Sequence, residues 1–311
     1  MRELKSFGKF SEAAQVAVER AIELAGNSGR NHRIPISGVA TQRLSDGSVQ
    51  IVAEGVNGRI PMAASDRGYP TDHGETAAIR AISSVTDISW HDVVFATTLS
   101  PCAMCARALV ELSRLGLHKF VIAESTSFPG RRDLLDSINA SQVIGLAEPR
   151  AIELMRTFAN RYPWDWAADI GEIPTNGPMP SDDEGLERAI EQHLHKRPAR
   201  ACCSASVFDR NGNQLSFAED QRDDHAANPT FSAVIQAIGL AGSVINLREC
   251  VIVCGTEHSD RPVTRIEFGE ASIGACEVFR PARILFTSPV ERELLDVLKQ
   301  TGADVRVLRH R

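Results

Sequence analysis

The chain has 311 residues, of which 43% are hydrophobic and 24% are charged, so it can bury a substantial core and is expected to form two domains. Its formal net charge of −6 argues against a protein whose main partner is a polyphosphate, because binding to a nucleic-acid backbone needs clustered lysine and arginine. The sequence has no apolar run long enough for a membrane helix, no secretory signal at its start and no disulfide spacing among its seven cysteines, so a reducing, cytoplasmic location without membrane contact is expected.

The first half of the chain is predicted to alternate between helices and strands. A helix over 11–27 carries apolar residues on one side, with Ser11 as its N-cap. Strands over 36–43 and 49–56 flank Asp46-Gly47, a dipeptide typical of hairpin turns. The elements that follow are, in order, a helix from Gly74 to about Ser84, a strand over Val93–Thr98, a helix from Cys102, a strand over Phe120–Ala123 and a helix over 151–160.

Residues 173–184 contain three prolines, one glycine and three acidic residues, which predicts a linker between two domains. The predicted elements after it repeat the order of the first half: a helix over 183–195, strands over 201–208 and 213–217, a helix over 230–241, a strand over 249–254, a short helix over 272–279, a strand over 282–287, a helix over 290–301 and a strand over 304–308. We therefore infer an internal duplication. Strands that alternate with helices predict a mixed α/β sheet with helices on its faces.

Two short motifs, His73-Gly74-Glu75 and Pro101-Cys102-Ala103-Met104-Cys105, stand at the predicted starts of two helices. Three ligands, His73, Cys102 and Cys105, leave the fourth tetrahedral position of a zinc ion open for water, which is typical of a catalytic zinc site. The cation lowers the pKa of that water and makes hydroxide available. Glu75 is not expected to bind the metal, but it can carry protons from the water to the substrate and to the leaving amine. Together the motifs match the zinc deaminase pattern.

Two alternatives explain less of this pattern. A closed zinc site that only stabilises the fold needs a fourth ligand, and the nearest candidates, His91 and His118, are predicted to lie in a loop and at a strand edge. A redox pair of cysteines would account for neither His73 nor Glu75.

Over about residues 10–172 the sequence resembles the cytidine deaminase superfamily, and within it the fungal-type cytosine deaminases that act on the free base. The segments that carry the resemblance are Ile34–Gly38, His73-Gly74-Glu75, Thr97–Cys105, Glu124–Phe128 and Arg161–Glu172. The resemblance implies tandem three-layer α/β/α domains, each with a five-stranded mixed sheet flanked by helices. Residues 1–175 would form a catalytic zinc-dependent deaminase domain, and 182–311 a degenerate deaminase-like domain without a metal site.

The resemblance also implies how a base would be bound. Asn57 would hydrogen-bond the edge of the base, the Gly74 amide would contact its carbonyl, and Asp169 would accept a hydrogen bond from a ring N–H. The backbone carbonyl of Ser100 would face the departing amino group. Phe128 and Trp166 would form the walls of the pocket. A planar heterocycle needs apolar walls and a few fixed polar contacts, which these residue types supply. The alternatives are a turn residue for Asn57, plain core packing for Phe128 and Trp166, and a surface acid near a helix end for Asp169.

The predicted activity is zinc-dependent hydrolytic deamination of a free nucleobase, most simply cytosine to uracil and ammonia, with one zinc ion per chain and Glu75 as proton shuttle. Another small amino-heterocycle, such as guanine, a nucleoside like cytidine, a modified pyrimidine or a triazine, is the alternative substrate. The negative net charge and the absence of an arginine- and lysine-rich stripe in the sequence argue against a tRNA adenosine deaminase. A non-enzymatic binding module fits the second half but not the first, where Glu75 is useful only for proton transfer.

The sequence departs from the family pattern in three ways. Arg107 stands where glycine is usual, residues 58–71 carry extra prolines before the active-site helix, and the chain has two domains where the fungal-type enzymes have one. When the two halves are aligned on Ala77–Ile82 and Ala233–Ile238, Pro229 and Phe231 occupy the positions of His73 and Glu75.

The second half is therefore expected to lack metal and to take the place of a homodimer partner in an intrachain pseudo-dimer, with a homodimer as a further possibility. Its cysteines, Cys202, Cys203, Cys250, Cys254 and Cys276, are expected to be buried and inert.

Overall fold

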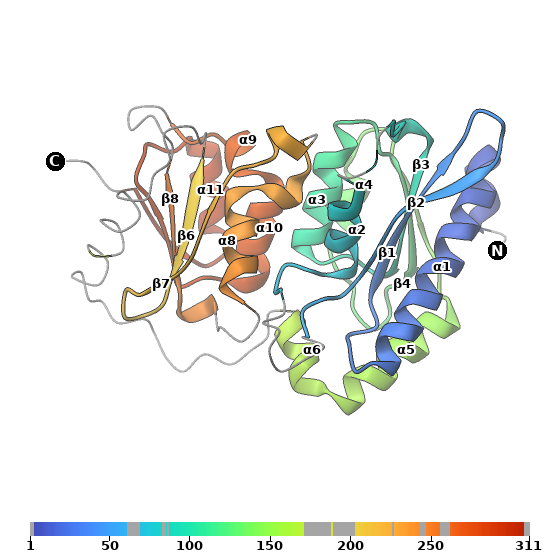
Figure 1. The fold of residues 1–311 in the computed structure, drawn as a ribbon, viewed down its shortest axis with the longest axis horizontal. Helices are drawn as coiled ribbons and strands as arrows, with labels where there is room; N and C mark the ends of the chain where they lie inside the picture. The colour runs from blue at the N-terminus through green and yellow to red at the C-terminus, as the bar shows by residue number, and fades with distance from the viewer. Residues whose placement is uncertain are drawn as a thin grey trace. The chain divides into compact units, whose positions relative to one another are not determined.

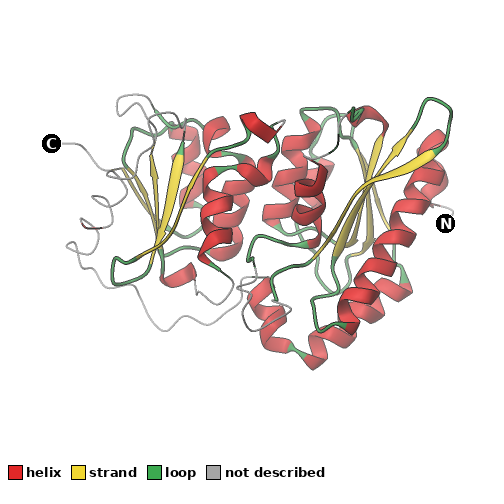
Figure 2. Ribbon diagram, in the orientation of Figure 1, coloured by secondary structure: helices red, strands yellow, loops and turns green. Residues whose placement is uncertain are grey.

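The computed structural model describes residues 3–60, 69–82, 85, 87–170, 188, 203–225, 227–242, 247–255 and 262–307, which belong to two compact units, Met1–Ile170 and Gly171–Arg311 (Figure 1). The linker predicted over 173–184, Cys202 and most of the helix predicted over 183–195 lie outside the described residues; Arg188 within that helix is helical. Each unit contains a five-stranded mixed sheet with helices packed on it, which confirms the predicted fold class (Figure 2).

The sheet of the first unit has the strand order β2-β1-β3-β4-β5. Its strands are β1 (Ser37–Arg43), β2 (Val49–Val56), β3 (Val93–Leu99), β4 (Lys119–Glu124) and β5 (Gln142–Gly145). β1 pairs antiparallel with β2 and β3, whereas β3, β4 and β5 are parallel. The predicted β1–β2 hairpin is confirmed: Gly47 adopts φ 89° in the turn, and Asp46 accepts the backbone N–H of Ser48 at 2.9 Å.

Helices cover both faces of this sheet (Figure 1). The helices are η1 (Glu3–Phe10), α1 (Ser11–Arg30), α2 (Gly74–Ile82), η2 (Trp90–Asp92), α3 (Ala103–Ser113), α4 (Arg132–Asp136), α5 (Pro149–Arg161) and α6 (Pro163–Asp169). α1 buries its apolar side against Val39, Val94 and Val121 of the strands, and α2 lies on the opposite face. No helix in the described ranges is both long enough and apolar enough to cross a membrane.

Some local predictions need correction. Ser11 is the first residue of α1 rather than its N-cap; Phe10 occupies the cap position, without a side-chain hydrogen bond. α4, β5 and α6 were not predicted as elements. α4 has five residues and β5 four, so neither is long enough to display a hydrophobic period.

The second unit repeats the topology of the first. Its elements are β6 (Ser204–Phe208), β7 (Gln214–Glu219), η3 (Asp223–His225), η4 (Pro229–Phe231), α8 (Ala233–Ala241), η5 (Leu247–Glu249), β8 (Val251–Gly255), α9 (Arg265–Phe268), α10 (Glu270–Phe279), β9 (Arg283–Phe286), α11 (Arg292–Lys299) and β10 (Asp304–Val307). The order β10-β9-β8-β6-β7 is that of the first sheet, and both hairpins shift register after the fourth residue of their first strand, at Ala40/Thr41 and Val207/Phe208. An internal duplication accounts for both correspondences. Cys203, Cys250, Cys254 and Cys276 are buried, as expected.

Glycines let the β1–β2 hairpin lie directly against the first turns of α2. A Cβ atom added to Gly55 would come within 2.1 Å of the Ala78 backbone nitrogen and 2.5 Å of the Gly74 carbonyl oxygen. A Cβ atom added to Gly38 would lie 2.9 Å from the Glu75 Cα atom. Because only a residue without Cβ fits at these contacts, the two glycines set the depth at which α2 sits on the sheet.

Replacing Gly55 with alanine is therefore expected to lower the free energy of unfolding by about 2–3 kcal/mol, because the backbone of α2 must move away from the strand. Urea denaturation followed by circular dichroism measures the change. Gly26→Ala in α1 is the matched control, since its added Cβ would approach no closer than 3.8 Å to the tip of Arg30 and should leave stability unchanged or higher. Equal stability of the Gly55→Ala and wild-type proteins would contradict the close contact.

Candidate active site

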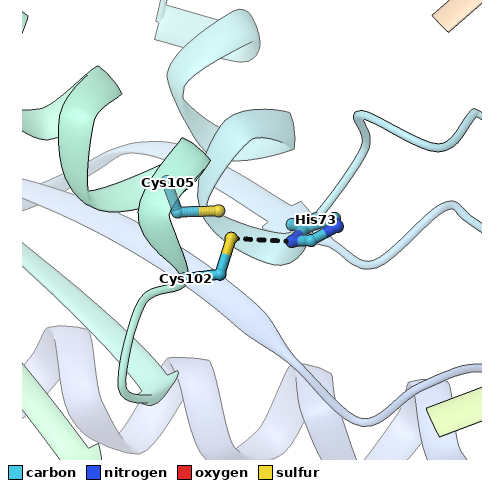
Figure 3. A group of neighbouring side chains, drawn as sticks. All are labelled: His73, Cys102 and Cys105. Atoms are coloured by element: carbon cyan, nitrogen blue, oxygen red, sulfur yellow. Dashed lines mark hydrogen bonds between the residues drawn. The ribbon is translucent and has the colours of Figure 1, made fainter. Parts of the chain in front are cut away.

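Three potential metal ligands meet where α2 and α3 begin. His73 immediately precedes α2; its carbonyl accepts the N–H of Ala77 at 2.9 Å, and the Thr76 hydroxyl accepts the His73 N–H at 3.0 Å. Cys102 caps the start of α3, and Cys105 lies in its first turn. The ligand atoms of His73, Cys102 and Cys105 all lie within 4.8 Å of one another, and both sulfur atoms face the imidazole (Figure 3). The Cys102 Sγ atom is 3.4 Å from His73 Nδ1.

Burial and close approach perturb the protonation of all three ligands. The hydrogen bond from the Cys105 thiol and the proximity of His73 hold the pKa of Cys102 well below its usual value. Burial and the Cys102 sulfur raise the pKa of Cys105 well above its usual value. Burial disfavours a charged His73 ring, but the charges of Asp169, Cys102 and Glu75 outweigh that effect and raise the pKa of His73 to about 9.

This donor set fits a zinc ion. One imidazole nitrogen and two sulfur atoms in a buried group are ligands that zinc prefers, and a divalent cation can take the place of the protons that the group otherwise holds. Among the described residues no fourth histidine, cysteine or acid joins the group, which fits the open zinc site better than the closed one. His91 and His118 lie with their ring centroids 6.1 Å from each other and outside the group.

Glu75 lies beside the ligands without belonging to their group. Its side chain is 2% exposed, and its Oε1 atom accepts a hydrogen bond of 2.8 Å from the Thr97 hydroxyl on β3. Burial, together with the charge of Cys102, raises the pKa of Glu75 to about 7, in the range where a carboxyl group can both take up and release a proton near neutral pH. The sequence alone does not assign a role to Thr97. Its hydrogen bond to Glu75 joins a strand to a helix residue 22 positions earlier in the chain, and such a contact leaves no local pattern.

Two of the predicted base-binding residues contact each other next to the metal ligands. Asn57 and Asp169 are buried, and the Asn57 amide donates from Nδ2 to Asp169 Oδ1 at 3.0 Å. The same oxygen is 3.6 Å from His73 Nε2. Asp169 is thus not a surface acid, and Asn57 does more than shape a turn. Their binding of a base remains a prediction.

The other predicted residues surround the same region. The rings of Phe128 and Trp166 meet edge to face, with centroids 5.8 Å apart, and both pack as half-buried residues against the cluster that contains Leu99 and Phe158. Gly74 is buried at the start of α2, and Ser100 is buried where β3 leads to Cys102. These positions are compatible with contacts to a substrate and equally with packing in the protein core. The predicted substrate contacts of these residues therefore also remain predictions.

At the corresponding helix starts of the second unit, serines take the places of His73 and Cys105. Ser232 precedes α8 as His73 precedes α2, and Ser272 is the third residue of α10 as Cys105 is of α3. The two serine hydroxyl oxygens lie 2.9 Å apart and are buried. The sequence alignment had placed Pro229 at the position of His73; the short helix η4, which precedes Ser232, accounts for the difference of three residues.

In the second unit a hydrogen bond thus joins the two helices where the first unit has its potential ligands. Ser232→Ala would leave the Ser272 hydroxyl buried without this partner, so the free energy of unfolding is expected to fall by about 1–3 kcal/mol. The double variant Ser232→Ala/Ser272→Ala should lose less free energy of unfolding than the sum of the losses in the two single variants. Urea denaturation measures both. Additive losses would contradict a direct interaction, and the zinc content of either variant should equal that of the wild type.

Comparison with known proteins agrees with this geometry. Residues 11–123 match the family model described as the cytidine and deoxycytidylate deaminase zinc-binding region. A cytosine deaminase of Candida albicans is 35% identical to this chain over 100 residues, which cover 32% of the chain and 64% of the Candida protein, slightly less than two thirds of its length. The predicted resemblance and the predicted zinc cofactor are confirmed for this part of the chain. The first unit is therefore similar, over residues 11–123, to the cytidine and deoxycytidylate deaminase zinc-binding region, and His73, Cys102 and Cys105 are grouped there as possible zinc ligands.

Proposed function

We propose that the protein is a zinc-dependent hydrolase that deaminates a free nucleobase, with cytosine as substrate and uracil and ammonia as products. The observation that carries the proposal is the buried group of His73, Cys102 and Cys105 with the carboxyl group of Glu75 beside it. A closed site or a redox pair does not call for such a carboxyl group. The similarity of this half to a cytosine deaminase favours cytosine over the other amino-heterocycles.

The zinc ligands and Glu75 have different roles in the proposed hydrolysis. When bound by its three ligands, zinc supplies an activated water molecule. Glu75, held by the Thr97 hydroxyl, would take a proton from the attacking water and pass it to the ring nitrogen of the base. It would then move the second proton from the hydroxyl group added at the ring carbon to the departing amino group. One water is consumed, the exocyclic C–N bond breaks, a C=O bond forms, and ammonia leaves.

The remaining residues would bind and orient the base. We assign Asn57 to the edge of the base, Asp169 to a ring N–H and the Gly74 amide to the carbonyl. Phe128 and Trp166 would form apolar walls, and the Ser100 carbonyl would accept a hydrogen bond from the departing amine. A site built to pair N–H groups rejects analogues that leave those partners unpaired.

We assign catalysis to residues 1–175 and a supporting role without metal to residues 182–311. Ser232 and Ser272 at the helix starts of the second unit favour this division, since hydroxyl groups are not the ligands of a zinc site. The pseudo-dimer and any homodimer remain predictions.

Ammonia release by zinc-loaded protein tests the proposal. The substrates are cytosine, 5-substituted cytosines, cytidine, adenine and guanine, each with and without a chelator. Cytosine is expected to give the highest kcat/KM, and the chelator is expected to abolish turnover. A higher value for guanine or cytidine would replace the proposed substrate, and no ammonia from any of them would refute the activity.

A further inference from the structure

Glu124 is a buried acid at the end of β4, four residues before the proposed pocket wall Phe128. The residue is fully buried, and its Oε2 atom accepts the backbone N–H groups of Thr126 at 2.6 Å and of Ser127 at 3.0 Å. The other oxygen, Oε1, is also buried, and none of the described residues forms a hydrogen bond with it. A single carboxyl oxygen therefore fixes the backbone of the turn that follows β4.

The turn that Glu124 fixes leads directly to Phe128. Thr126 and Ser127 are exposed, so their side chains contribute little packing to the position of the turn. The Phe128 ring, in contrast, is half-buried and meets the Trp166 ring edge to face, with the centroids 5.8 Å apart. The carboxyl group of Glu124 is thus the contact that connects the rigid end of β4 to the backbone from which the Phe128 ring extends.

The two ends of the same loop are held by the segment directly before α3. Ser100 donates its N–H to the Glu124 carbonyl at 2.9 Å and its hydroxyl to the Pro129 carbonyl at 2.7 Å. The approach is close, since a Cβ atom added to Gly130 would lie 2.5 Å from the Pro101 carbonyl oxygen. None of these contacts uses the Glu124 side chain, so substitutions at position 124 should leave the segment before α3 in place.

We propose that Glu124 is a positioning residue for substrate binding: through the backbone of the turn it holds Phe128 against Trp166 as a wall of the base pocket. The substrate readout rests on the proposed deaminase function, whereas the turn can be measured without it. Glu124 acts through Phe128 and does not itself touch the base. A wall of this kind contacts the base equally before and during the reaction, so its displacement should raise KM and leave kcat nearly unchanged.

The test compares Glu124→Met, which keeps the length of the side chain but removes the carboxyl oxygens, with Glu124→Gln, whose amide oxygen can still accept both N–H groups. Glu124→Met is expected to raise KM for cytosine by about tenfold or more, to leave kcat within about threefold, and to retain zinc. Amide hydrogen exchange of Thr126 and Ser127, measured by NMR, should become about tenfold faster or more. Glu124→Gln should keep all of these values within about threefold of the wild type.

Asp209→Leu is the matched control. One oxygen of Asp209, in the turn between β6 and β7, likewise accepts two backbone N–H groups, those of Asn211 and Asn213, each at 2.8 Å. The substitution removes the same kind of contact from the second unit, so it should speed amide exchange in its own turn and leave KM, kcat and zinc content unchanged. A rise in KM as large as that of Glu124→Met would mean that general destabilisation, and not the position of Phe128, weakens binding.

A double-mutant cycle with Phe128→Ala identifies the route of the effect. If Glu124 acts through Phe128, Glu124→Met should add less than about twofold to the KM of the Phe128→Ala variant. Additive effects overturn the proposal, and so does a wild-type KM in Glu124→Met. An equal rise in KM in Glu124→Gln, with the two amides still protected from exchange, also overturns it, because the charge and not the turn would then matter.

A second variant covers the case in which Glu124→Met does not fold. Glu124→Ala then takes its place, because water can enter the vacated space and bind the freed N–H groups, and the same outcomes decide. A wild type without deaminase activity would refute the proposed function instead, and amide exchange would still report on the turn that Glu124 holds.

Discussion

Replacing Glu75 with glutamine is expected to reduce kcat by about 10³-fold or more while leaving zinc bound, because the amide keeps the shape of the side chain but cannot take up and release a proton. The Thr97 hydroxyl can still donate to the amide oxygen, so the side chain should stay in place. Zinc should remain because Glu75 is not one of the grouped ligands. The measurements are ammonia release under saturating cytosine and the zinc content of the purified variant.

Glu54→Gln is the matched control for this experiment. Glu54 lies on β2 of the same unit and pairs with Arg20 at 2.6 Å, so the same chemical change is made outside the site. Its kcat should be that of the wild type. Undiminished turnover in Glu75→Gln would contradict the assigned proton transfer, whereas simultaneous loss of zinc would mean that Glu75 supports the metal site instead.

The parts of the fold that the sequence predicts correctly are those fixed by local chemistry. The β1–β2 hairpin depends on Asp46 and Gly47, and its strands end where predicted, at 43 and 56. His73 and the two cysteines lie at helix starts as predicted, and their ligand atoms are grouped. β5 was missed because four half-buried residues at a sheet edge carry no clear alternation.

Contacts between distant segments could not be predicted in the same way. Asn57 and Asp169 are 112 positions apart, and nothing in their local sequence distinguishes a buried hydrogen-bonded pair from two exposed polar residues. Thr97 belongs to a recognised motif, yet its bond to Glu75 depends on how α2 lies over β3. In the second unit, the sequence alignment does not pair Ser232 with His73, because the three residues of the short helix η4 shift the correspondence between the two halves.

Removal of one metal ligand is expected to abolish both zinc binding and activity. Cys105→Ala deletes a fully buried sulfur of the group and leaves His73 and Cys102, which cannot complete a site of three protein ligands. Its zinc affinity should fall by more than the ~10- to 100-fold that follows loss of an outer partner of a ligand. Elemental analysis after dialysis against a weak chelator should detect less zinc than in the wild type, and no ammonia should be released from cytosine.

The same substitution should lower stability, because zinc that binds only the folded state adds to the free energy of unfolding. At a free zinc concentration about 1,000 times the dissociation constant, this contribution is about 4 kcal/mol. A strong chelator should therefore lower the melting temperature of the wild type but not that of Cys105→Ala. Cys276→Ala removes an equally buried thiol from α10 in the second unit and should retain zinc, activity and the response to chelator. If Cys105→Ala kept its zinc, or if Cys276→Ala lost it, the metal would be bound elsewhere, and the assignment of catalysis to the first unit would be wrong.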